Sequence, residues 1–287
     1  MVQTATKLVP VRHHAALLLK MRDERVLVIS DLHMGWEVSL AHQGFHVPSQ
    51  TPKLLKRLSR LVRTHKPTRI IIIGDVKHTI AKVEMEEWRD VPDFFEEVTK
   101  MVPKVQVIPG NHDGNLEPLL PESIDILPST GIILWDVGLF HGHAWPPPEM
   151  LKCKHLIIGH VHPVVAFRDP TGFRITRQVW VKCACNAPEL ARFVLNRSGM
   201  KVIEDPSKSF KDHYNLDLNA SQLFIMPSFN DFLGGQAVNR SGLGRGEKFS
   251  QFIGPVLRSG SINIEEAQVY LLDGTFLGTV GQLRALG

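Results

Sequence analysis

Short apolar runs rich in isoleucine and valine recur through the first two thirds of the chain, and each run ends abruptly in a polar or glycine-containing cluster. The clearest runs cover residues 26–30, 70–73, 105–108 and 156–158. Runs of only a few residues, separated by amphipathic stretches, are typical of strands buried in an α/β sheet. The alternation therefore predicts an α/β fold.

Two amphipathic helices are expected between these runs. The first covers residues 51–66, with Thr51 as a cap, Pro52 at the first helical position and Pro67 just past the end. Leucines form one face of it, and the other face carries Lys53, Lys56, Arg57, Arg60 and Arg63. That basic face suits a polyanion, although a solvated helix surface is the more ordinary explanation. The second helix covers about residues 84–101, and its expected inward side comprises Met85, Trp88, Phe95, Val98 and Met101.

The later part of the chain predicts a second sheet packed on the first. Its expected strands cover residues 131–135, 137–140, 155–158, 164–168 and 176–181, followed by a strand over residues 222–226. A polar and basic insertion is expected over about residues 186–219, and a glycine-rich surface loop over about residues 230–259. A final hairpin pairs residues 267–272 with 275–280 and turns at Asp273-Gly274.

Composition and charge limit the classes of function. The net charge of +4 and the pI near 9.0 are compatible with an anionic substrate but too weak to establish nucleic-acid binding. No apolar run reaches about 18 residues, so we expect no membrane span. An odd number of cysteines and an N-terminus without a secretory pattern predict a cytoplasmic protein. Cys183 and Cys185 are interpreted as small buried residues rather than a metal or redox pair.

Five clusters of His, Asp and Asn follow the predicted strands. They are Asp31 with His33, Asp75 in GD, Asn111 with His112 and Asp113, His141 in HGH, and His160 with His162. Ligands in an α/β sheet collect at the carboxyl ends of the strands. We therefore expect all five clusters to reach one edge and their side chains to converge.

The donor types in these clusters match a pair of metal ions. Imidazole, carboxylate and amide donors together suit manganese, iron, zinc or cobalt rather than an all-oxygen calcium or magnesium site. A spacing of two residues, as in Asp31 and His33, points both side chains the same way from an extended backbone. Asp75 can offer one oxygen to each of two ions about 3.5–4 Å apart. An isolated DxH or HxH pair is a weak signal of a metal site and GNHD is a stronger one, and the five clusters in this order are a strong signal.

The ordered motifs DLHMG, GDVKH, GNHDG, HGH and GHVHP resemble the calcineurin-like metallophosphoesterase superfamily, whose signature is DxH, GD, GNH(D/E), H and GHxH. Within it, DLHMGWE, GDVKH and PSFNDFLGGQAVN look like the SbcD-related, ICC-like phosphoesterases common in archaea. The resemblance implies a single domain over residues 1–287. It also implies an α/β fold of two packed mixed β-sheets flanked by helices, a four-layer αββα sandwich.

The resemblance also implies a role for each motif residue. The expected ligands of the first metal are Asp31, His33 and His162, with Asp75 as the bridge, and those of the second are Asn111, His141 and His160. His112 would act as general acid or transition-state stabiliser, oriented by Asp113, and His78 would lie close to the scissile phosphate. His143 remains an alternative to His141 as the ligand from HGH.

The implied activity is hydrolysis of a phosphodiester through a metal-bridging hydroxide, without a covalent enzyme intermediate. Manganese is the favoured ion, with iron, zinc, nickel and cobalt as alternatives. The substrate is a phosphoester, and nucleic acid is one option because of GDVKH and the basic stretches. The alternatives are a phosphodiesterase or phosphomonoesterase acting on a small nucleotide-type molecule, and a non-catalytic metal-binding scaffold. All of the motif residues are present, which disfavours the scaffold.

Two further features lie near the motifs in the sequence. Phe229, Asn230, Gly234 and Gly235 are expected to form a lip over the metals. Glu37 is either a group supporting the metal ligands or a carboxylate at a helix N-terminus, where the helix dipole favours it.

Overall fold

The computed structural model describes residues 5–168, 171–202, 205–240 and 253–286. The chain divides into two compact units. Unit 1 comprises Met1–Ser129 with Ser228–Leu233, and unit 2 comprises Thr130–Pro227 with Gly234–Gly287. Each unit has its own sheet and its own hydrophobic core. That both units form one domain remains a prediction.

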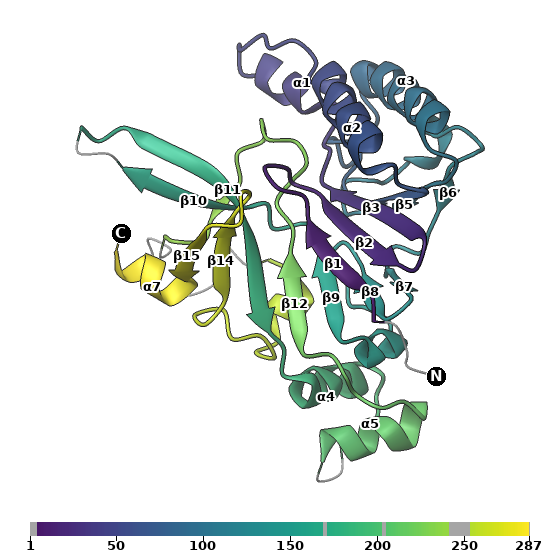
Figure 1. Cartoon of the computed structure of the whole chain (residues 1–287), viewed down its shortest axis with the longest axis vertical. Helices are drawn as coiled ribbons and strands as arrows, with labels where there is room; N and C mark the ends of the chain where they lie inside the picture. Colours follow the sequence, from purple (N-terminus) through teal and green to yellow (C-terminus); the bar gives the residue numbers. More distant parts are fainter. Residues whose placement is uncertain (1–4, 169–170, 203–204, 241–252, 287) are drawn as a thin grey trace. The chain divides into compact units, whose positions relative to one another are not determined.

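The sheet of unit 1 has six strands in the order β1-β2-β3-β4-β5-β6 (Figure 1). The first three strands pair antiparallel, and β3 to β6 pair parallel. β3, β4 and β5 are buried along nearly their whole length, as their apolar runs predict. The strand bounds are β1 Lys7–Pro10, β2 Leu17–Met21, β3 Glu24–Ser30, β4 Arg69–Ile73, β5 Val105–Ile108 and β6 Asp125–Ile126.

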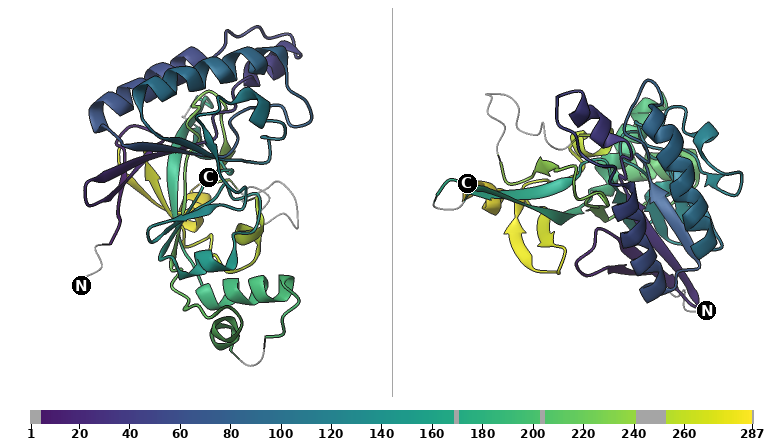
Figure 2. Two further views of the ribbon diagram at one scale, coloured as in Figure 1. Left: turned by 90° about the vertical axis from the view of Figure 1, so that its right-hand side faces the viewer. Right: turned by 90° about the horizontal axis from the view of Figure 1, so that it is seen from above.

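Three α-helices belong to unit 1, and the two long ones lie side by side across its sheet (Figures 1 and 2). They are α1 Trp36–Ala41, α2 Thr51–His65 and α3 Met85–Met101, and a short 3₁₀ turn, η1, follows at Glu117–Leu119. α2 buries its leucine face, and Lys66 in a left-handed conformation ends it. The helix predicted over residues 51–66 is confirmed within one residue.

The predicted inward side of α3 is wrong in its first turns. Met85 and Trp88 are 80% and 50% exposed, whereas Glu87 and Asp90 are buried. Glu87 faces inward because its carboxylate accepts hydrogen bonds from the backbone N–H groups of His78 and Thr79. A prediction from hydrophobicity alone therefore chose the wrong inward face for the first turns of α3, because the buried Glu87 carboxylate binds backbone N–H groups there.

The sheet of unit 2 follows the order β13-β10-β11-β12-β9-β8-β7, and β14 pairs with both β11 and β15. β9 pairs parallel with β8 on one side and with β12 on the other. Most other pairs in this sheet are antiparallel. The bounds are β7 Ile132–Leu134, β8 Val137–Leu139, β9 His155–Ile158, β10 Pro163–Arg168, β11 Arg174–Ala184, β12 Gln222–Ile225, β13 Gln236–Ala237, β14 Gln268–Leu271 and β15 Phe276–Thr279. Two mixed sheets with helices confirm the predicted fold class.

The predicted insertion over residues 186–219 folds into two helices, α4 Ala187–Arg197 and α5 Pro206–Tyr214. The side chain of Asn186 caps α4 by accepting from the N–H of Glu189, and Asp205 caps α5 in the same way. α4 buries Leu190, Ala191 and Leu195 in the core of unit 2. The insertion is therefore part of that core.

The rest of unit 2 contains an η2 turn at Pro148–Lys152, and helices α6 Pro255–Arg258 and α7 Val280–Ala285. The predicted glycine-rich loop is more structured than expected, because β13 and α6 lie within it. Its residues 241–252 lie outside the described part of the chain. Among the described helices, none is long and apolar enough to cross a membrane.

Candidate metal centre

The five motif clusters follow strands of two sheets. Three of them follow the parallel strands β3, β4 and β5 of unit 1, and two follow the parallel strands β8 and β9 of unit 2. The prediction that all five reach one edge is therefore wrong. Each motif does follow the carboxyl end of a parallel strand, as the rule for α/β sheets requires. Sequence alone does not tell which of these strands pair in one sheet.

Five of the predicted ligands have a backbone conformation that L-residues rarely adopt. The φ angles are 57° at Asp31, 43° at His33, 48° at Asp75, 66° at His160 and 47° at His162. The assumption of an extended backbone in DxH and HxH is thus wrong. Left-handed backbone at a residue other than glycine costs about 1–3 kcal/mol and gathers at functional sites. The described chain has eleven such residues, so the five ligands make up nearly half.

The loop that carries Asp31 and His33 is joined to the loop that carries Asp75. The N–H of Asp31 donates to the carbonyl of Gly74 at 3.1 Å, and the N–H of His33 donates to the carbonyl of Asp75 at 2.8 Å. These bonds hold the strained backbone in place, because releasing it would leave buried N–H groups without acceptors.

Residues 228–233, here called the strap, support the same loop. The N–H of Phe229 donates to the carbonyl of Ser30 at 2.8 Å, and the hydroxyl of Ser228 donates to the carbonyl of Asp31 at 2.8 Å. The side-chain amide of Asn230 donates to the carbonyl of Leu32 at 2.9 Å. Phe229 and Asn230 are fully buried in unit 1, so the prediction that they form a lip is wrong.

Asp31, His33 and Asp75 form the acidic part of the centre. Each offers a ligand atom, and these atoms lie within 4.8 Å of one another. His33 Nε2 lies 3.3 Å from Asp75 Oδ2, and all three side chains are buried. Buried carboxylates are stabilised by a bound cation, and oxygen and imidazole donors together suit a transition metal. The donor set therefore fits a divalent ion.

The GNHD loop packs closely on Asp75. The N–H of His112 donates to Asp75 Oδ1 at 3.0 Å. A Cβ atom at Gly110 would lie 2.1 Å from the same oxygen, so this position excludes every side chain. Asn111, the predicted amide ligand, lies between these two residues. The glycine of GNHD therefore allows the loop that carries Asn111 to approach the Asp75 carboxylate closely.

Three imidazoles gather beside this acidic group. His33, His78 and His112 each offer a ring nitrogen, and these nitrogens lie within 4.8 Å of one another. His112 Nδ1 contacts the carbonyl oxygen of His78. Because a carbonyl only accepts, Nδ1 of His112 carries the proton there, and Nε2 is the nitrogen that can exchange a proton with a substrate.

Asp113 supports the loops on which the other residues lie. Its Oδ1 accepts from the N–H groups of Val76 at 2.8 Å and Lys77 at 3.2 Å, and its Oδ2 accepts from the N–H of Gly110 at 2.8 Å. The predicted role of Asp113 was to orient His112. The structure places the carbonyl of His78 at the His112 ring and the carboxylate of Asp113 on backbone N–H groups of both loops.

Sequence reasoning missed Glu87 and Lys77. Glu87 is fully buried, and its Oε1 accepts from the N–H groups of His78 at 3.0 Å and Thr79 at 2.7 Å. Lys77 is also fully buried and donates to the carbonyl of Thr79; burial lowers the pKa of Lys77, against the opposing charge of Glu87. The available signal was Gly35 in DLHMG, where a Cβ atom would lie 2.6 Å from Glu87 Cγ.

The predicted ligands of unit 2 are all histidines. His141 and His160 have ring centroids 4.8 Å apart, and each offers a ligand nitrogen within 4.8 Å of the other. The centroid of His143 lies 6.2 Å from that of His160. His141 is fully buried, whereas His143 is half-buried. These observations favour His141 over His143. The N–H of Gly159 donates to the carbonyl of His141 at 3.1 Å and joins the two motif loops.

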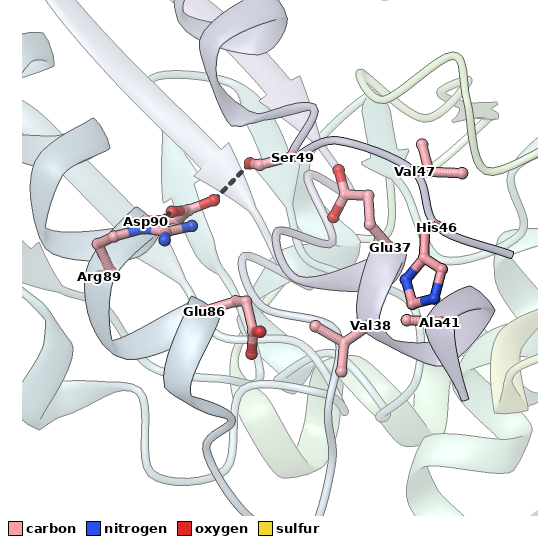
Figure 3. Close-up of a pocket in the computed structure, with 9 residues that line it drawn as sticks. All are labelled: Glu37, Val38, Ala41, His46, Val47, Ser49, Glu86, Arg89 and Asp90. Atoms are coloured by element: carbon pink, nitrogen blue, oxygen red, sulfur yellow. Dashed lines mark hydrogen bonds and ion pairs between the residues drawn. The ribbon is translucent and has the colours of Figure 1, made fainter. Parts of the chain in front are cut away.

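A separate pocket of about 210 Å³ lies in unit 1 between α1, the following loop and the start of α3 (Figure 3). Glu37 is buried there and its carboxylate accepts from the N–H of Gln50, while Ser49 donates to Asp90. Burial raises the pKa of the Glu37 carboxyl. No predicted ligand lines this pocket, whose residues are Glu37, Val38, Ala41, His46, Val47, Ser49, Glu86, Arg89 and Asp90. Glu37 therefore secures the loop after α1.

Comparison with known proteins gives one family match. The model of the calcineurin-like phosphoesterase family matches residues 24–203. Among solved structures, nuclease MPE of Pseudomonas putida is 20% identical, with 94% of this chain and 98% of that chain covered and a TM-score of 0.46. The phosphoesterase YfcE of E. coli is also 20% identical, with 50% and 73% covered and a TM-score of 0.32. No curated protein sequence matches the chain.

Proposed function

The chain belongs to the calcineurin-like phosphoesterase family and is a metal-dependent phosphoesterase, and we propose that it hydrolyses phosphodiesters with two divalent ions. The observation that carries the proposal is the strained, left-handed backbone at five predicted ligands. Strain of this kind persists only where the surrounding structure enforces it, and here loop-to-loop hydrogen bonds do so in unit 1.

The proposed ligands divide between the two units. Asp31, His33 and Asp75 with Asn111 come from unit 1, and His141, His160 and His162 come from unit 2. The family pattern assigns Asp31, His33 and His162 to one ion, Asn111, His141 and His160 to the other, and Asp75 to both. Two bound divalent ions would supply a hydroxide near neutral pH and neutralise phosphate oxygens.

His112 is the proposed general acid. Its Nδ1 is anchored at the carbonyl of His78, which leaves Nε2 to donate a proton to the leaving oxygen. Glu87 fixes that carbonyl indirectly by accepting from the N–H of His78. His78 itself would contact the scissile phosphate through its ring.

Manganese is the proposed ion, and iron, zinc, nickel and cobalt share the same preference for mixed nitrogen and oxygen donors. A cytoplasmic location is proposed with it. Cys153, Cys183 and Cys185 support this, because all three are free thiols. Disulfides are rare in that compartment.

A nuclease acting on DNA or RNA is the proposed form of this phosphodiesterase. GDVKH and the likeness to SbcD-related phosphoesterases support it. A phosphomonoesterase or a phosphodiesterase for small nucleotide-type molecules is the second candidate, because the same donor set serves both. The scaffold alternative loses weight because Asp31, His112 and the other motif residues are all retained.

The experiment compares two chromogenic substrates, bis-p-nitrophenyl phosphate and p-nitrophenyl phosphate, on protein stripped with a chelator and reloaded with each metal. A phosphodiesterase hydrolyses the first faster and only after metal is restored. Faster hydrolysis of the monoester would favour the second candidate. Absence of turnover on both substrates with every metal would contradict the proposal and revive the scaffold.

A further inference from the structure

The exposed face of α2 carries a stripe of positive charge. Lys53, Lys56, Arg60 and Arg63 are exposed, Arg57 is half-buried, and their spacing of three and four residues places them along one side of the helix. α2 contains no Asp or Glu. From Lys53 to Arg63 the stripe is about 15 Å long, given the rise of a helix. Its charge therefore has no neutralising partner on its own helix.

Neighbouring elements neutralise little of this charge. Arg57 pairs with Asp231 of the strap and donates to the carbonyl of Phe229 at 2.6 Å. Within the described residues, no carboxylate pairs with Lys56, Arg60 or Arg63. His14, in the turn between β1 and β2, also lies beside the stripe: burial, then the charges of Arg57 and Arg60, lower its pKa. The surroundings thus leave most of the positive charge of the stripe uncompensated.

An aromatic pair with one exposed ring lies at the start of this stripe. Phe232 of the strap is 43% exposed, and its ring meets that of Trp36 edge to face, with centroids 5.2 Å apart. Lys53 Nζ lies 5.9 Å from the Phe232 centroid, which is within cation–π range. A large exposed aromatic ring beside a cation is a stacking platform for a nucleobase with a partner for its phosphate.

Both rings are held next to the loop of Asp31 and His33. The N–H of Phe232 donates to Asn230 Oδ1 at 3.1 Å, and the amide of Asn230 donates to the carbonyl of Leu32. The N–H of Trp36 donates to the carbonyl of His33 at 3.2 Å. Hydrogen bonds therefore attach both aromatic residues to the loop that carries the predicted metal ligands Asp31 and His33.

We propose that the α2 stripe and the Phe232–Trp36 pair form a track that binds single-stranded nucleic acid and leads it to the metal ligands of unit 1. The inference rests on the proposed function and names its substrate class. A single strand fits because its bases are free to stack on Phe232, whereas the bases of a duplex are already stacked. The phosphates would follow Lys53, Lys56, Arg60 and Arg63.

The first test measures binding of a fluorescent oligo-dT of about 12 nucleotides with phosphorothioate linkages, which resist cleavage, to the manganese-loaded protein. The variant K56Q/R60Q/R63Q removes three cations from the stripe. The matched control R197Q/K201Q/K208Q removes three exposed cations from unit 2. In about 0.1 M salt, the stripe variant should bind at least about tenfold more weakly, and its salt slope should fall by about 2. The control should retain the affinity of the native protein.

An equal loss in both variants, or no loss in the stripe variant, would overturn the track. Hydrolysis of bis-p-nitrophenyl phosphate by the same samples separates this failure from failure of the proposed function. If the native protein hydrolyses the small diester but does not bind oligo-dT, the track is wrong and the phosphodiesterase stands. If it does not hydrolyse the small diester with any metal, the proposed function itself fails.

The second test addresses the aromatic pair. Phe232→Ala should weaken oligo-dT binding by about 5- to 100-fold, and Phe232→Tyr should restore it, because stacking needs only the ring. Oligo-dT should also raise the pKa of His14, followed by its NMR ring signals, because a nearby polyanion favours the imidazolium. Equal affinity for a duplex of the same length, or an unchanged affinity in Phe232→Ala, would contradict single-strand binding.

Discussion

The two units contribute very different parts to the proposed centre. Unit 1 supplies both predicted carboxylate ligands, Asp31 and Asp75, and holds their loops by backbone bonds, the strap and Asp113. Unit 2 supplies only imidazoles, at His141, His160 and His162. Both predicted anionic ligands and the hydrogen bonds that support their loops therefore lie in unit 1, whereas unit 2 adds only neutral donors. Substitution of a carboxylate of unit 1 should therefore lower metal-dependent activity more than substitution of a histidine of unit 2.

Asp75→Asn should give the largest effect. The variant keeps the size of the side chain but loses the charge that the proposed ions share, so hydrolysis of bis-p-nitrophenyl phosphate should fall by at least about 1,000-fold. Circular dichroism should show a folded protein. Retained manganese-dependent turnover in this variant would remove Asp75 from the bridge.

His112→Gln should lower kcat by about 10²–10⁴-fold while leaving the manganese content unchanged. The reason is that His112 is proposed to donate a proton to the leaving oxygen and not to bind a metal ion. Steady-state kinetics and elemental analysis on one preparation measure both. If metal content and activity fell together, His112 would be a metal ligand and not the proton donor.

His141→Gln should weaken metal binding by about 10- to 100-fold, and His143→Gln should leave it nearly unchanged. The two variants are a matched test of the unit 2 ligands, because both residues belong to HGH and only His141 is fully buried beside His160. Calorimetric titration with manganese distinguishes them. The reverse order of effects would assign the ligand to His143.

Asn230→Ala should destabilise the protein by about 1–3 kcal/mol, because the buried carbonyl of Leu32 loses its donor. Asn239→Ala is a matched control, since Asn239 is equally buried and makes two bonds to Ala166 within unit 2. Both should lower Tm, but only Asn230→Ala should also weaken manganese binding. Equal metal affinity in the two variants would mean that the strap does not support the ligand loop.

The smallest effect concerns the thiols of unit 2. Burial raises the pKa of Cys183 to about 12 and that of Cys153 to about 11, from the ordinary value of 9.0. Unfolded thiols ionise first, so this contribution to stability is full below pH 9.0 and is lost as the pH rises toward about 12. Urea unfolding across that window should show a decline that Cys183→Ala reduces. A decline identical in the variant would exclude Cys183 as its source.

Most strands and the identity of the motif clusters were predictable because local patterns determine them. β5 has the predicted bounds, and α2 differs by one residue. The same patterns also predicted that each motif follows the carboxyl end of a strand. Glu87 was not predictable as a buried residue, because its role depends on N–H groups exposed by a distant loop.

The contacts of the strap and the left-handed backbone of the ligands also could not be predicted from the sequence. Asn230 reaches Leu32 across 198 positions of the chain, and no local pattern reports such a bond. The positive φ angles of Asp31 and His162 are ones that L-residues rarely adopt, so backbone propensities predict a different conformation at both positions. Tertiary hydrogen bonds enforce that backbone at Asp31, which explains why spacing alone misjudged it.

The central claim is that two ions are needed for hydrolysis. The most direct measurement returns manganese stepwise to chelator-stripped protein and follows bound metal per chain together with hydrolysis of bis-p-nitrophenyl phosphate. The account predicts that two ions bind per chain and that turnover rises with the second. Full turnover with one ion bound, or two ions bound without turnover, would contradict it.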